Sequence, residues 1–151
     1  MRRLKELNEI SEHKFIGVHI FGEMYGIDSK YLNDCNILKE ALEDGIKQSG
    51  ATLCSMQEKS FSPSGATLLA LLSESHAPIH TYPEFNALFF DAFTCGQTCR
   101  PERIAEALIK ALKPKTHKLH KKTRGDEDFT NPLDSEEVSL EAENLHDEIT
   151  C

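Results

Sequence analysis

The sequence predicts an α+β fold, a two-layer sandwich in which helices cover one face of a mainly antiparallel sheet. Two observations predict it: the elements run strand, helix, strand, several strands and a last helix, and only two segments have a helical apolar stripe. Two helices cover a single face of such a sheet. We therefore expect the other face to need a partner, and the simplest partner is a second copy in a dimer.

The first half of the chain predicts a strand, a helix and a second strand. Residues 14–22 form an apolar run typical of a strand. A helix then begins after Asp34 or Asn36 and ends at Gly50, a natural helix stop. Its apolar side chains recur at helical spacing: Leu38, Ala41, Leu42 and Ile46. Residues 51–56 follow as the next strand.

The second half predicts two more strands and one helix. Residues 61–65 have the composition of a turn, and the short apolar run 66–73 that follows favours a strand. Residues 87–94 are the next strand. A helix opens at Pro101 and ends before Pro114. Its buried stripe consists of Ile104, Leu108, Ala111 and Leu112.

Charge and composition divide the 151 residues into three parts. An N-terminal extension covers 1–13, the folded domain covers 14–114, and 115–151 are expected to be a disordered, charged tail. The net charge of −8 comes from residues 125–151 of this tail, because 10 of the 25 acidic residues lie there and no Lys or Arg does. The folded part is nearly neutral and lacks the basic face that nucleic-acid binding requires, so we expect no nucleic-acid partner.

The cysteines and the apolar runs indicate the compartment. Five cysteines show no disulfide framework, and residues 1–13 are too charged for a signal peptide. No apolar stretch approaches the ~20 residues of a membrane helix. We expect a cytoplasmic protein with free thiols and no membrane association.

A nucleophile, two candidate bases and a candidate acid lie within two dozen residues: Ser75, His76, His80 and Cys95, with Glu74 before the serine. By itself this inventory is also compatible with a serine at a strand end in a polar loop. No Gly-x-Ser-x-Gly elbow surrounds Ser75, so the segment does not predict a hydrolase.

Zinc binding is a second hypothesis for the same residues, because His76 and His80 are four residues apart and Cys95 and Cys99 repeat that spacing. Pro78 disfavours the helix on which two such histidines could share a metal. In an extended segment they lie ~13 Å apart. The spacing therefore disfavours zinc, and we expect no metal.

Four segments in order resemble the self-cleaving bacterial and archaeal S-adenosylmethionine decarboxylases over residues 14–113. They are Gly17-Val18-His19 with Glu23-Met24-Tyr25-Gly26, Phe61-Ser62-Pro63-x-Gly65, Glu74-Ser75-His76-x-x-Ile79-His80-Thr81-Tyr82-Pro83-Glu84, and Asp91-x-Phe93-Thr94-Cys95-Gly96. The match in order and spacing is far more specific than any one of these segments.

The resemblance implies that the chain is a zymogen that cleaves itself between Glu74 and Ser75. Ser75 Oγ attacks the carbonyl of Glu74, assisted by His80 and the hydroxyl of Thr67. β-Elimination and hydrolysis then leave a covalent pyruvoyl group at residue 75. The products are a β chain of residues 1–74 and an α chain of residues 75–151, and the processed protomers are expected to dimerise.

The resemblance also implies a carboxy-lyase. The pyruvoyl group forms a Schiff base with the amine of S-adenosylmethionine and accepts the electrons released by decarboxylation. Cys95 returns a proton to the substrate carbon. Phe61 stacks on the adenine, Glu84 binds the ribose and Tyr82 lines the pocket. The product serves as the aminopropyl donor in spermidine (polyamine) biosynthesis.

Three departures from the family pattern leave alternatives open. Tyr82 replaces the usual Trp, Ala77-Pro78 replaces a larger apolar residue and a small hydroxyl residue, and Val18 replaces a basic residue. Because pocket shape decides which amino acid is decarboxylated, a homologue acting on ornithine or arginine is the first alternative. An uncleaved, non-enzymatic binding protein is the second.

Overall fold

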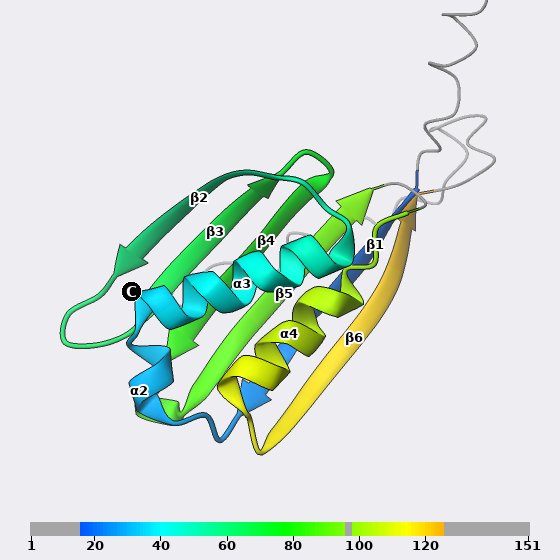
Figure 1. Cartoon of the computed structure of the whole chain (residues 1–151). Helices are drawn as coiled ribbons and strands as arrows, with labels where there is room; N and C mark the ends of the chain where they lie inside the picture. The colour runs from blue at the N-terminus through cyan, green and yellow to red at the C-terminus, as the bar shows by residue number, and fades with distance from the viewer. Residues whose placement is uncertain (1–15, 96–97, 126–151) are drawn as a thin grey trace, which may run out of the picture.

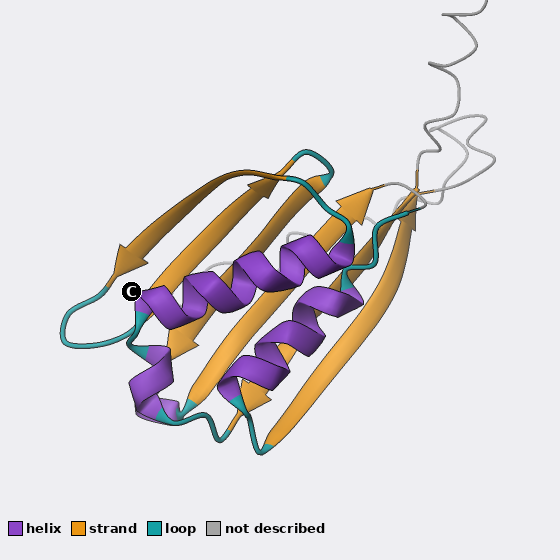
Figure 2. Cartoon of the chain, in the orientation of Figure 1, coloured by secondary structure: helices purple, strands orange, loops and turns teal. Residues whose placement is uncertain are grey.

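The computed structural model describes residues 16–95 and 98–125. They form one six-stranded antiparallel sheet, in the order β2-β3-β4-β5-β1-β6, with two long helices on one face (Figure 1, Figure 2). The elements are β1 (Ile16–Tyr25), α2 (Ser29–Leu32), α3 (Cys35–Ser49), β2 (Leu53–Ser60), β3 (Ala66–Leu72), β4 (Ser75–Tyr82), the short 3₁₀ turn η2 (Pro83–Phe85), β5 (Ala87–Cys95), α4 (Glu102–Leu112) and β6 (Thr116–Gly125). The predicted α+β two-layer sandwich is confirmed.

The boundaries of α3 follow from its caps. Asp34, not Asn36, is the N-cap, and its carboxylate accepts hydrogen bonds from the backbone N–H groups of Asn36 and Ile37. Gly50 ends the helix with φ of 82°, a conformation that glycine adopts without cost. Gly45 faces α4, where a Cβ atom would lie 2.8 Å from the Cα of Ile104. The two helices can therefore approach closely at this point.

The core lies between the helices and one face of the sheet. Strand alternation shows this on β3, where Leu68, Ala70 and Leu72 are buried while Leu69 and Leu71 are exposed. The opposite face, which we call the open face, carries none of the described helices (Figure 1). Phe21, Leu69, Leu71, Tyr82 and Phe89 leave large apolar groups exposed on it. Among the described helices, none has the length and apolar character of a membrane span.

One expectation about the elements is wrong, and one interior strand was not predicted. Residues 116–125, placed in the disordered tail, form β6, which pairs with β1 over ten consecutive residues. Its side chains are polar because β6 is an exposed edge strand, so the segment has no apolar signal of its own. Residues 75–82, for which no element was predicted, form the interior strand β4. The extension 1–13 and the rest of the tail lie outside the described residues.

Candidate functional site

The peptide bond expected to cleave lies where the turn after β3 enters β4. The backbone N–H of Cys95, at the end of β5, donates a 3.0 Å hydrogen bond to the carbonyl oxygen of Glu74. Ser75 has φ of 156°, a region that residues other than glycine rarely occupy. Backbone strain and a polarised carbonyl thus coincide at one peptide bond.

The side chain of Glu74 holds this turn against the neighbouring strand. Its Oε2 atom accepts a 2.9 Å hydrogen bond from the backbone N–H of Thr52, just before β2. Cys54 Sγ lies 3.2 Å from Ser73 Oγ in the same region. Contacts on both sides of the turn therefore restrict the position of the Glu74 carbonyl.

A row of polar side chains extends from Ser75 across the open face. Ser75 Oγ lies 3.0 Å from His76 Nδ1. His76 Nε2 lies 3.9 Å from Asp91 Oδ1, and His19 Nε2 donates a 2.7 Å hydrogen bond to the same oxygen. His76 was expected only as one of two candidate bases, and His19 and Asp91 had no expected role. The three residues lie on three strands, and only the pairing register brings them together.

Thr67 and His80 form a separate pair. Thr67 Oγ1 lies 2.9 Å from His80 Nδ1, on directly opposed residues of β3 and β4. The strand rise places His80 roughly 16 Å along β4 from Ser75. Within one chain, His80 therefore lies far from Ser75, the residue that it was expected to assist.

The three expected substrate contacts lie at the same end of the sheet as His80. Phe61 follows β2 and is 51% exposed, and Tyr82 ends β4 with its ring 5.1 Å from that of Phe89. Glu84 is exposed in η2. Tyr82 is roughly 23 Å along the strand from Ser75. The predicted residues thus form two half-sites, one around Ser75 and one around His80.

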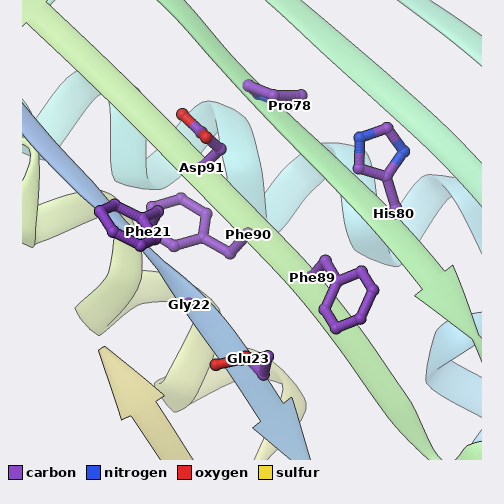
Figure 3. A pocket seen from close by; sticks show the side chains of 8 residues that line it. All are labelled: Phe21, Gly22, Glu23, Pro78, His80, Phe89, Phe90 and Asp91. Carbon is purple, nitrogen blue, oxygen red and sulfur yellow. The ribbon is translucent and has the colours of Figure 1, made fainter. Parts of the chain in front are cut away.

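A shallow pocket of about 290 Å³ lies on the open face between the half-sites. Figure 3 shows His80 on β4 and Asp91 on β5 at its edges, with the helices behind the sheet. The remaining lining residues are Phe21, Gly22, Glu23, Pro78, Phe89 and Phe90. Within the described residues, the buried Oε2 of Glu23 has no hydrogen-bond partner.

The thiols near the cleavage site are free. Cys95 is exposed, and Cys99 is partly buried. Burial raises the pKa of the Cys99 thiol, and the Glu74 carboxylate and Cys95 raise it further, against a hydrogen bond to Thr98. His76 and His80 lie on one extended strand, and residues 16–95 and 98–125 contain no cluster of three metal-ligating side chains.

Comparison with known proteins gives a consistent result. The sequence model of a family described as S-adenosylmethionine decarboxylase matches residues 18–125, a range that ends with β6. An S-adenosylmethionine decarboxylase proenzyme from Brevibacillus brevis is 41% identical over 114 residues, 76% of this chain and 86% of that protein. One from Picrophilus torridus is 34% identical over 110 residues, 73% of this chain and 85% of that protein. The crystal structure of the adenosylmethionine decarboxylase from Aquifex aeolicus superposes with a TM-score of 0.71 at 34% identity, covering 78% of this chain and 98% of that one.

Proposed function

The chain belongs to the S-adenosylmethionine decarboxylase family, and we propose that it is a proenzyme that cleaves itself between Glu74 and Ser75 to become a pyruvoyl-dependent decarboxylase of S-adenosylmethionine. The observation that carries this proposal is the hydrogen bond from the Cys95 N–H to the Glu74 carbonyl oxygen. A donor at this position stabilises the negative charge that develops when a nucleophile attacks the carbonyl carbon. The hydroxyl of Ser75, on the next residue, would be the nucleophile.

A dimer formed through the open face would complete the site. His80 and Thr67 are roughly 16 Å along the sheet from the Ser75 of their own chain. A two-fold axis through the middle of the open face would reverse β4 of a second copy, so that the Thr67–His80 pair of one copy meets the Ser75 end of the other. The exposed Leu69, Leu71 and Phe89 would be buried in this contact.

The pyruvoyl group would supply an electron sink at residue 75 for the electrons released when the substrate loses carbon dioxide. The residues around it fit this chemistry. Cys95 is exposed at the end of β5 with its backbone N–H on the Glu74 carbonyl, and its thiol would return a proton to the substrate carbon. Phe61 and Tyr82 of a second copy offer exposed aromatic faces for the adenine, and Glu84 offers a carboxylate for the ribose hydroxyls.

The named relatives support S-adenosylmethionine as the substrate, and nothing in them supports ornithine, arginine or an uncleaved binding protein. The product would serve as the aminopropyl donor for spermidine synthesis. We place the enzyme in the cytoplasm because Cys95 acts as a free thiol, which a reducing compartment preserves.

Mass spectrometry of the purified full-length chain tests the cleavage. We expect fragments 1–74 and 75–151, the second beginning with a pyruvoyl group, whereas the Ser75→Ala chain stays whole. Release of carbon dioxide from S-adenosylmethionine, arginine and ornithine is then measured with the cleaved protein. An uncleaved wild-type chain with full activity would contradict the pyruvoyl mechanism, and activity on arginine or ornithine alone would contradict the proposed substrate.

A further inference from the structure

Four polar side chains connect the cleavage site to β1 across the open face: Ser75, His76, Asp91 and His19. We infer that His76 is the general base that removes the hydroxyl proton of Ser75 at the start of self-cleavage, and that Asp91 and His19 position it. This inference rests on the proposed self-cleavage and assigns a base to its first step. The 3.0 Å distance from Ser75 Oγ to His76 Nδ1 is within the range for proton transfer.

The arrangement around His76 selects the tautomer that can accept this proton. Nδ1 accepts a hydrogen bond from the serine only when the imidazole carries its own proton on Nε2. Nε2 lies 3.9 Å from Asp91 Oδ1, so the carboxylate lies on the Nε2 side of the ring while Nδ1 faces the serine. The 2.7 Å hydrogen bond from His19 Nε2 to Asp91 Oδ1 holds the carboxylate in place.

Aromatic packing keeps the two histidines on either side of one ring. Phe93 is paired with His76 on β4 and with His19 on β1. Its ring centroid lies 6.2 Å from that of His76 and 5.9 Å from that of His19. The guanidinium of Arg124, on β6, lies 4.6 Å from the centre of the same ring. Four strands therefore contribute to the position of the row.

The first step is balanced without any added reactant. The O–H bond of Ser75 breaks and its proton moves to His76 Nδ1, while Oγ bonds to the carbonyl carbon of Glu74. The carbonyl π electrons move onto the oxygen that the Cys95 N–H contacts. When the C–N bond then breaks, the proton on His76 moves to the nitrogen of Ser75. The result is an ester and an amine, and His76 is neutral again.

His76 and His80 therefore act in two different steps of self-cleavage. His76 adjoins Ser75 in the same chain and acts in ester formation. His80 lies roughly 16 Å away along β4 in the same chain. With His76 as the base of the first step, we infer that a His80 supplied by a second copy removes the α-proton of residue 75 in the later step, in place of the assistance to the attack that was expected of it. A chain without His80 should therefore stop at the ester, whereas a chain without His76 should rarely reach it.

Hydroxylamine distinguishes these two blocks, because it cleaves an ester at Glu74 but leaves a peptide bond intact. We expect His80→Ala to be cut between residues 74 and 75 by hydroxylamine, leaving a Glu74 hydroxamate and an N-terminal Ser75. In the His80→Ala chain, the further substitution His76→Gln should slow formation of the ester by about 100-fold relative to His80→Ala alone, which is the usual range for a lost general base. His117→Gln, an exposed histidine on β6, is the matched control and should have no effect.

Rescue by free imidazole tests the proton transfer itself. We expect imidazole in solution to speed cleavage of His76→Ala by at least about 10-fold and to leave Ser75→Ala uncleaved. If His76 served only in packing, free imidazole would not raise the cleavage rate of His76→Ala. If the wild-type chain and His76→Gln cleave at the same rate, the base assignment is overturned and the proposed function remains. If the wild-type chain never cleaves, both are overturned.

The positioning role of Asp91 is tested with a double-mutant cycle. Asp91→Asn should slow cleavage by about 10-fold in the wild-type chain and have almost no effect in His76→Gln, because the carboxylate acts only through the imidazole. Equal effects in both backgrounds would show that Asp91 acts independently of His76. Thermal unfolding of each variant identifies any loss of rate that comes from loss of the fold.

Discussion

The backbone N–H of Cys95 donates a 3.0 Å hydrogen bond to the carbonyl oxygen of Glu74. Through this contact the end of β5 adjoins the bond that is proposed to break. In the proposed mechanism the N–H group of Cys95 serves cleavage and its thiol serves decarboxylation.

Substitution of Cys95 should separate these two reactions. Because Cys95→Ala keeps the N–H group, we expect the chain to cleave at more than about a tenth of the wild-type rate, while decarboxylation falls by about 100-fold or more. Fragment formation is followed by mass spectrometry, and activity by carbon dioxide release. Cys35→Ala, which removes a free thiol at the start of α3, is the control. Loss of cleavage with retained decarboxylation per cleaved chain would reverse the assignment.

Mixed dimers should reveal whether His80 acts across subunits. We expect neither His80→Ala nor Ser75→Ala to yield fragments alone. When tagged versions are co-expressed in equal amounts, about half of the His80→Ala chains should be cleaved, because random pairing places half of them against a copy with an intact His80. Mass spectrometry of each tagged chain gives the fraction. No cleavage in isolated mixed dimers would show that His80 does not act in trans.

Gly45 should be intolerant of any side chain. Its Cβ position lies 2.8 Å from the Cα of Ile104 on α4, a backbone atom that cannot rotate away. We expect Gly45→Ala to lower the free energy of unfolding by about 1–3 kcal/mol, in spite of the better helix propensity of alanine. Urea denaturation measures the change. Asp44→Ala, an exposed position on the same helix, should change stability by less than about 0.5 kcal/mol.

The pair between Glu102 on α4 and Lys121 on β6 should give a small, pH-dependent stabilisation. Burial acts to raise the pKa of Glu102, but the Lys121 hydrogen bond and the charges of Lys121 and Arg100 outweigh it, so the pKa lies below its ordinary value of 4.5. A lowered acid pKa stabilises the fold above the ordinary pKa, and this stabilisation is lost as the pH falls through the folded-state pKa.

We therefore expect Glu102→Gln to cost less than about 1 kcal/mol at neutral pH, since the pair is largely exposed. The difference from wild type should stay constant down to about pH 4.5 and shrink below it. Urea denaturation at several pH values measures this. Glu106→Gln breaks a local pair with Arg103 on the same helix and serves as the control. A difference that grows in acid would contradict the sign of the shift.

Elements whose signal is local can be predicted from the sequence alone. The apolar stripe and the caps predicted α3 within about one residue, and short apolar runs predicted β3 and β5. Pro78 correctly excluded a helix that would have joined His76 and His80 at a metal. The four motifs and their order were sufficient to predict the family, because each motif consists of residues that are neighbours along the chain.

Only the tertiary structure decided how strands that are distant in sequence are paired. β6 has no apolar pattern, and it is a strand because β1 offers it an edge of unpaired backbone groups. The same register brings His19 and Asp91 together across 72 residues and aligns them with His76. It also places Ser75 and His80, close in sequence, far apart in one chain, because an extended strand separates residues that a helix or a turn would bring together.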